Sequence, residues 1–234
     1  MMNTTVKNES VGSEFVAFTA ETRAPKFDRL AKCYRWMEIL TFGPLLSRCR
    51  TAFLPELASA RRALILGDGD GRFTAELLRV NSLVQIDAVD ASHGMLDALV
   101  RRARADSHRI RAHCADAREW RPENGQYDLV ATHFFLDCLT TDECHALASR
   151  MRDAVSPSAT WIVSEFAVPE GWFGRLAARP LVWLLYKVFG LLTGLETRSL
   201  PDHHAALRDA GFNLTRRGAR LRGVLVSEMW RSKT

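Results

Sequence analysis

The chain has few cysteines and no cysteine spacing of the metal-binding or disulfide type. Its five cysteines stand at positions 33, 49, 114, 138 and 144, and no C-x-x-C pair occurs. A disulfide framework and a metal site are therefore not expected. Reduced thiols in a cytoplasmic protein are the simple interpretation. The N-terminal segment also lacks an apolar stretch of the signal-peptide type, so no secretory signal is expected.

Nucleic-acid motifs, internal repeats and low-complexity tracts are also missing. The formal net charge is +5, and arginines cluster at 61–62, 101–104 and 216–222. Without interleaved aromatic residues, these clusters are interpreted as solvated faces, and no nucleic-acid partner is predicted. At 234 residues a single domain is expected over 25–234, preceded by a polar, flexible segment over 1–24.

What the chain does have is a short apolar run that ends in alternating glycines. Residues 63–66 are apolar, and glycines follow at 67, 69 and 71. The run predicts a buried parallel strand, the glycines predict the turn after it, and residues 73–78 predict a helix. Glycine lets a ligand approach the backbone closely, and a helix N-terminus offers unpaired N–H groups. Open α/β sheets hold nucleotide-like cofactors at such a turn.

A second β-rich run, residues 83–90, ends in a carboxylate. Asp90 lies about twenty residues beyond the glycine turn, where α/β folds place the acid that binds ribose hydroxyls. Asp87 is the competing acid, but it falls too early on an alternating strand. Asp90 could instead cap the helix predicted over 92–102, although Ser92 can fill that role itself.

The remaining pattern completes the predicted fold. Further strands are predicted over 109–112, 127–132 and 160–166, and a terminal hairpin over 212–217 and 223–230. This order predicts an α/β fold with a doubly wound, seven-stranded, mostly parallel sheet of the Rossmann-like type, with a helical apolar insert before the terminal β-hairpin.

The G-x-G-x-G spacing of residues 67–71 resembles the first motif of class I S-adenosylmethionine-dependent methyltransferases. Residues 27–43 and 209–212 are similar to motifs of the ubiquinone/menaquinone biosynthesis C-methyltransferases, and this resemblance runs from about Phe27 to the C-terminus. It implies S-adenosyl-L-methionine as the cofactor and a small lipophilic or aromatic methyl acceptor. A quinone precursor is the finer expectation.

The resemblance also implies a set of cofactor-binding residues. The set is Gly67, Asp68, Gly69, Asp70, Gly71, Thr74, Asp90, Ala91, Met95, Asp116, Ala117 and His133. Within it, Asp116 and Ala117 match an adenine-binding pair. The family usually has an acid two residues before the first glycine, and this chain has Ile65 there. Asp68 or Asp70 is expected to supply the missing carboxylate.

A general base is needed if the acceptor is a hydroxyl or a phenol-activated carbon. His133 and Asp137, after the fourth strand, are the first candidates, and His203 and His204 are the second. Two alternatives stay open. One is another S-adenosylmethionine reaction on the same fold, such as cyclisation or decarboxylation. The other is a non-catalytic cofactor-binding partner protein. A nicotinamide oxidoreductase is disfavoured because Arg72 replaces the third fingerprint glycine.

Residues 170–200 form the apolar insert. Its apolar part, residues 180–192, is too short to span a membrane comfortably, and Lys187 interrupts it. Three interpretations remain: a lid over the acceptor, peripheral contact with the inner face of a membrane, or plain core packing. The lid and membrane interpretations rest on its aromatic residues Trp172, Phe173, Trp183, Tyr186 and Phe189.

Overall fold

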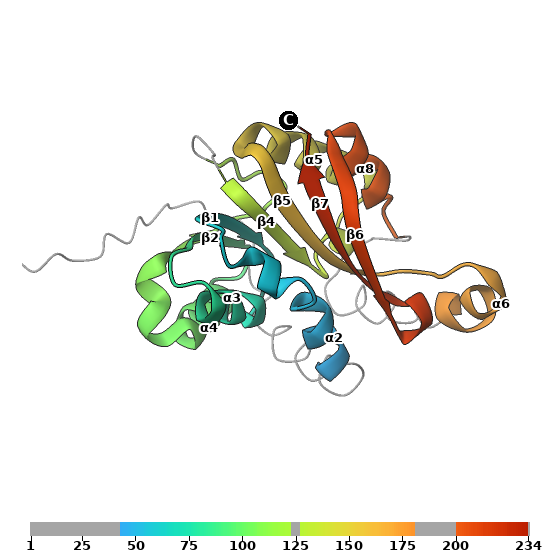
Figure 1. Cartoon of the computed structure of the whole chain (residues 1–234), viewed down its shortest axis with the longest axis horizontal. Helices are drawn as coiled ribbons and strands as arrows, with labels where there is room; N and C mark the ends of the chain where they lie inside the picture. Colours follow the sequence, from blue (N-terminus) through green and yellow to red (C-terminus); the bar gives the residue numbers. More distant parts are fainter. Residues whose placement is uncertain (1–42, 123–126, 181–199, 234) are drawn as a thin grey trace, which may run out of the picture.

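The computed structural model describes residues 43–122, 127–180 and 200–233 and contains one sheet between helical layers (Figure 1). The strands are β1 (Arg62–Leu66), β2 (Gln85–Asp90), β3 (Ile110–Cys114), β4 (Tyr127–His133), β5 (Val155–Phe166), β6 (Phe212–Arg220) and β7 (Leu225–Ser232). The helices are α2 (Gly43–Arg50), α3 (Arg72–Val80), α4 (His93–Ala103), α5 (Thr141–Ala154), α6 (Gly171–Phe173) and α8 (His203–Asp209). Shorter helical turns are η1 (Leu54–Leu57), η2 (Arg104–Arg109), η3 (Leu136–Cys138), η4 (Gly174–Ala178) and η5 (Leu221–Gly223).

The seven strands pair in the order β3-β2-β1-β4-β5-β7-β6. Strands β1 to β5 are parallel, whereas β7 runs antiparallel to both β5 and β6. The predicted fold class is therefore confirmed. The strand order reverses between β1 and β4, so the crevice in which such sheets hold ligands lies at the carboxyl ends of these two strands.

Alternation along the strands divides the core into two layers, because successive side chains point to opposite faces. Leu64 and Leu66 pack with Trp161 and Trp230 on the face covered by α5 and α8. Ile65 packs on the other face, against α3 and α4. Figure 1 shows these two helix pairs on opposite sides of the sheet.

Asp87, a buried carboxylate on β2, fastens four neighbouring strands together. Tyr127 Oη on β4 donates to its Oδ2 at 2.9 Å, and His113 Nε2 on β3 lies 2.9 Å from its Oδ1. The Arg62 guanidinium at the start of β1 lies 3.8 Å away. Burial alone would raise the pKa of Asp87, but the hydrogen bonds from His113 and Tyr127 outweigh it and lower that pKa. Both oxygens of Asp87 therefore interact with side chains of the sheet, which gives this carboxylate a structural role.

The element ends differ modestly from the predicted ones. Strand β5 begins at Val155, well before the predicted start, because Val155 pairs with Tyr127 across a register irregularity. Ser92 is the N-cap of α4, and its hydroxyl accepts from Met95 N at 3.3 Å, as predicted.

Two predicted segments lie outside the described residues: the flexible segment 1–24 and the part of the insert over 181–199. The described parts of the chain contain no helix with the length and apolar character needed to cross a bilayer.

Candidate functional site

The glycine turn joins β1 to α3 at the carboxyl edge of the sheet. Gly67, Gly69 and Gly71 have φ values of +67°, +60° and +77°, which glycine adopts readily. A Cβ on Gly71 would lie 2.8 Å from Leu99 Cα, so α4 can pack here only against a glycine. Among the described residues, a Cβ on Gly69 would meet only Met95 Sδ, at 3.8 Å. The Gly69 backbone is therefore the open part of the turn, where a ligand can approach.

Asp68 closes the N-terminus of α3. Its Oδ2 accepts hydrogen bonds from Thr74 N at 2.8 Å and from Thr74 Oγ1 at 2.7 Å. Burial raises the pKa of Asp68, although these hydrogen bonds act in the opposite direction. Asp68 and Thr74, both predicted to contact the cofactor, thus hold each other and fix the start of the helix.

Asp70 ties the turn to the end of α4. Arg102 Nη2 lies 2.6 Å from Asp70 Oδ2, and Arg102 Nε donates to the Asp70 carbonyl at 2.8 Å. Arg72 Nε lies 3.2 Å from Asp70 Oδ1. Two guanidinium groups therefore balance the charge of this carboxylate.

Asp90 ends β2 beside the same turn. Its Oδ1 accepts from Ser92 N at 2.9 Å, and Gly69 N–H also donates to this carboxylate. Burial is the main cause that raises the pKa of Asp90 to about 6. No cation pairs with Asp90 among residues 43–122, 127–180 and 200–233. A largely buried carboxylate without a counter-ion has capacity left for further hydrogen-bond donors.

The loop that holds Asp116 and Ala117 follows β3 and lies against the end of β2. Ala115 N donates to the Asp90 carbonyl at 3.1 Å, which brings the two predicted adenosine-binding segments together. Arg118 Nη2 lies 2.5 Å from Asp116 Oδ2, and hydrogen bonding from Arg118 lowers the pKa of Asp116. Asp116 is ionised in this arrangement but shares its oxygens with Arg118.

His133 ends β4 and is buried. Its Nδ1 lies 3.0 Å from Ser164 Oγ, and its ring packs on Phe73 with a centroid separation of 4.3 Å. Burial, followed by the positive charge of Arg50, lowers the pKa of His133 well below its ordinary value. The imidazole is therefore neutral. Its Nε2 is buried and has no hydrogen-bond partner among the described residues.

Glu165, at the end of β5, belongs to this edge but was not predicted as a site residue. Its Oε1 accepts from Phe135 N at 3.2 Å and Leu136 N at 2.9 Å, which holds the loop after β4. Burial and then the nearby charge of Asp137 raise the pKa of Glu165 well above its ordinary value. Its Oε2 is buried and without a partner among the described residues. The signal for it was a carboxylate at the buried end of the predicted fifth strand.

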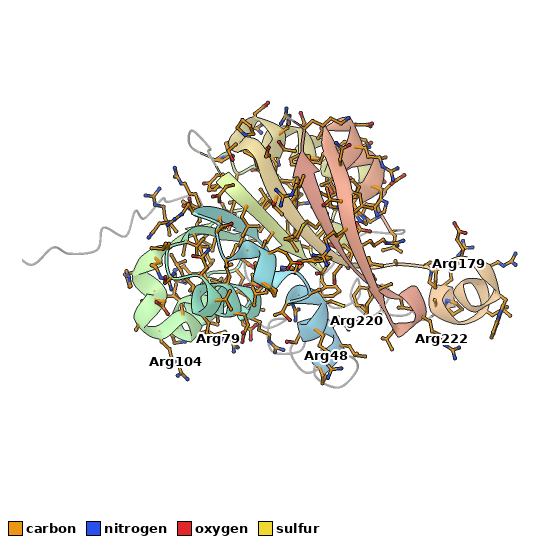
Figure 2. The ribbon with its side chains drawn as sticks, viewed as in Figure 1. Arg48, Arg79, Arg104, Arg179, Arg220 and Arg222 are labelled. Carbon is orange, nitrogen blue, oxygen red and sulfur yellow. The ribbon has the colours of Figure 1, made fainter. Side chains whose placement is uncertain are left out.

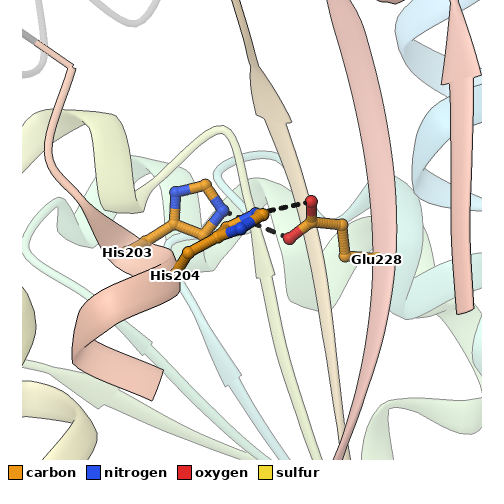
Figure 3. Close-up of side chains that lie close together, drawn as sticks. All are labelled: His203, His204 and Glu228. Atoms are coloured by element: carbon orange, nitrogen blue, oxygen red, sulfur yellow. Dashed lines mark hydrogen bonds and ion pairs between the residues drawn. The ribbon is translucent and has the colours of Figure 1, made fainter. Parts of the chain in front are cut away.

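The second pair of predicted bases, His203 and His204, is turned onto Glu228 of β7 (Figure 3). Their Nε2 atoms lie 3.2 and 2.7 Å from the two Glu228 oxygens, and Arg217 Nε lies 3.2 Å from Glu228 Oε1. The Trp230 indole N–H also donates to Glu228 Oε2, at 3.1 Å. The three side chains are close enough to hold a metal ion. However, four donors already satisfy the carboxylate and one carries a positive charge, so the cluster is interpreted as the anchor of α8 on β7.

Residues 63–158 match the sequence family described as "Methyltransferase domain". The matched segment begins in β1 and ends within β5. It therefore contains the glycine turn and both predicted adenosine-binding segments. No curated protein sequence matches the chain.

Solved structures of similar fold include methyltransferases of several kinds. An O-methyltransferase family protein from Burkholderia thailandensis has a TM-score of 0.67 at 17% identity, covering 88% of this chain and 60% of that one. The N-methyltransferase NodS from Bradyrhizobium japonicum, in complex with S-adenosyl-L-homocysteine, has a TM-score of 0.60 at 14% identity. The match covers 81% of this chain and 89% of that one. Human N-acetylserotonin methyltransferase in complex with SAM has a TM-score of 0.61 at 19% identity, and the match covers 88% of this chain and 55% of that one.

These likenesses show that the chain has the Rossmann-like methyltransferase fold. The chain spans 59–60% of the length of three O-methyltransferases that it resembles.

Proposed function

We propose that this protein is an S-adenosylmethionine-dependent methyltransferase that acts on a small lipophilic or aromatic acceptor. The family match over residues 63–158 and the fold support the methyltransferase class. The observation that best supports S-adenosylmethionine as the cofactor is that Asp90 lies beside the open backbone of Gly69. Together they offer a carboxylate without a counter-ion among the described residues and an open turn at the edge where such sheets bind nucleotides.

The residues present fit an adenosyl cofactor. Asp90 would accept hydrogen bonds from both sugar hydroxyls, since its carboxylate has acceptor capacity left. Asp116 and the Ala117 N–H would hold the purine, with Ala91 and Met95 beside them. When bound, S-adenosylmethionine supplies an electrophilic methyl group on its sulfonium.

The protein's own part in the reaction is to orient the acceptor, exclude water and remove a proton where the acceptor needs it. His133 is proposed as one base, because it is neutral and its buried Nε2 has no partner among the described residues. Its low pKa makes it a weak base, so an acidic acceptor such as a phenol suits it best. Asp137, next to the buried Glu165, is the other candidate.

The nature of the acceptor rests on the apolar insert and on the resemblance to quinone C-methyltransferases. The solved relatives include both O- and N-methyltransferases, so oxygen, nitrogen and carbon acceptors all enter the test. A non-catalytic cofactor-binding protein is the second candidate. It is favoured by Ile65, an apolar core residue where the family usually has an acid.

Titration calorimetry tests the cofactor. We expect S-adenosylmethionine and S-adenosylhomocysteine to bind and NAD to give no heat. Incubation with methyl-labelled S-adenosylmethionine and a panel of phenols, quinols and amines is expected to label a phenol or quinol. Binding without label transfer to any acceptor would favour the non-catalytic candidate, and absence of binding would refute the proposal.

Deleting residues 172–192 tests the proposed lid, which is part of the proposed single domain over 25–234. We expect the shortened protein to bind S-adenosylmethionine like the full chain, because the glycine turn, Asp90 and Asp116 lie in other elements. We expect it to lose methyl transfer, because the acceptor would no longer be enclosed. Retained turnover would refute the lid.

A further inference from the structure

Four of the five large apolar side chains exposed in the described residues belong to two short segments. Val168, Trp172 and Leu176 follow β5 with exposed fractions of 38%, 68% and 75%, and Leu221 in η5 is 38% exposed. The fifth, Leu83, lies elsewhere, between α3 and β2. Exposed apolar groups gathered in one patch usually mark a contact surface, whereas single ones need no explanation.

The two segments lie side by side at one end of the molecule (Figure 1). Ala167 N donates to the Val224 carbonyl at 2.8 Å, and Ala178 packs on Val224. A Cβ added to Gly223 would lie 3.1 Å from Pro169 Cβ. The helical segment after β5 and the β6–β7 turn therefore form one continuous surface, here called the end patch.

The helical part of the end patch is amphipathic. Side chains four positions apart share a face of a helix. Ala178 lies on the buried face, whereas Trp172 and Leu176 form an exposed apolar row. Arg175 and Arg179 form a second exposed row beside it. Apolar and basic side chains therefore alternate around the outward surface.

The charge of the end patch is positive. Arg179 of the helical segment and Arg222 of the turn lie at this end of the molecule, whereas Arg220 lies nearer α2 and interacts with Cys49 (Figure 2). With Arg175, the first two make three arginines at the end patch, against Glu170 as the only acidic residue of the segments 167–180 and 218–223. The surface thus combines apolar side chains with an excess of cations.

We propose that the end patch docks on a membrane of anionic lipid. Trp and Leu side chains insert at the headgroup–acyl boundary, and arginines beside them bind lipid phosphates. Two copies of the patch facing each other would bring six arginines together, so charge favours the lipid over a second copy of the chain. A lipophilic acceptor would then be available in the same membrane.

Vesicle flotation of the full chain, without cofactor, tests the proposal. We expect binding to phosphatidylcholine vesicles that contain phosphatidylglycerol, weak binding to pure phosphatidylcholine, and release by salt. Trp172→Ser with Leu176→Ser is expected to lower the partition coefficient at least about tenfold. Arg175→Gln with Arg179→Gln is expected to lower it about fivefold per arginine, equivalent to about 1 kcal/mol each.

Matched controls come from the other end of the molecule. Leu83→Ser removes the exposed leucine outside the patch, and Arg79→Gln with Arg104→Gln removes two arginines near α3 and α4 (Figure 2). These variants are expected to bind vesicles like the unchanged chain. Equal losses in controls and patch variants, or no lipid binding at all, would overturn the proposal. So would lipid-free self-association, seen in sedimentation, that the Trp172 and Leu176 changes abolish. A failure to bind S-adenosylmethionine would not alter the flotation result, so the two proposals fail separately.

Discussion

Replacing Asp90 by asparagine is expected to weaken S-adenosylmethionine binding at least about tenfold. The carboxylate is proposed to accept both sugar hydroxyls, and hydrogen bonds to a charged group contribute about 1.5–3 kcal/mol. An asparagine keeps the size but not the charge, so the loss reports the charge itself. Calorimetry at pH 8, where Asp90 is ionised, measures this change in affinity.

The same substitution is expected to stabilise the protein without cofactor. The folded pKa of Asp90, about 6, lies above the ordinary 3.8, so ionised Asp90 destabilises the fold. This penalty appears as pH rises from about 4 to 6 and is fully present above 6; it amounts to at most about 3 kcal/mol. Asparagine removes it but also loses one acceptor, so we expect a gain of about 1 kcal/mol in the free energy of unfolding at pH 8.

The pH dependence of binding gives a second measurement on Asp90. Affinity is expected to be highest above about pH 6 and to fall below it, because protonation removes the charge that the hydroxyls bind. Asp90→Asn should lack this fall. Asp97→Asn, at an exposed position on α4, is the control and should behave like the unchanged chain. Unchanged affinity for S-adenosylmethionine in Asp90→Asn would refute the proposed role of Asp90 in cofactor binding.

Gly71→Ala is expected to lower the free energy of unfolding by about 2–5 kcal/mol. The new Cβ would meet Leu99 Cα at 2.8 Å, and a backbone atom of a packed helix cannot easily move aside. The φ of +77° adds about 1–2 kcal/mol of backbone strain. Denaturant unfolding, followed by circular dichroism, measures the loss.

Substitutions at two other glycines distinguish backbone strain from the loss of packing and from the loss of ligand contact. Gly171 has a φ of +89°, and no atom of the described residues lies within 4 Å of a new Cβ. Gly171→Ala should therefore show the strain alone and bind cofactor normally. Gly69→Ala should lose similar stability but also weaken S-adenosylmethionine binding, because its methyl would enter the open side of the turn. If Gly71→Ala were no less stable than Gly171→Ala, the packing argument would be wrong.

The fold and the outline of the site were predictable because their signals are local. An apolar run followed by spaced glycines predicted β1 and its turn, and later β-rich runs predicted the other strands along the chain. The helix cap at Ser92 was predictable for the same reason, since a cap depends on residues within one turn.

The partners of the candidate site residues could not be predicted, because they are distant in the sequence. Arg102 reaches Asp70 across 32 positions, and His204 reaches Glu228 across 24. Neither partner can be identified before the packing of α4 and α8 is known. The role of Glu165 in holding the loop after β4 was missed similarly, because its partners are backbone N–H groups that carry no sequence signal.

The bond network around Asp87 has a mechanical consequence. It joins the strands β1, β2, β3 and β4 through Asp87 in the middle of β2. Two of its partners, Arg62 and Tyr127, stand at the starts of β1 and β4, so these strands are held most firmly away from the candidate site. Small rotations between strands are therefore expected to be greatest at their carboxyl ends, here called the rim, from which the loops after β1, β2 and β4 project. Amide protons at the rim should exchange with solvent through small openings, and those around Asp87 only when the whole domain unfolds.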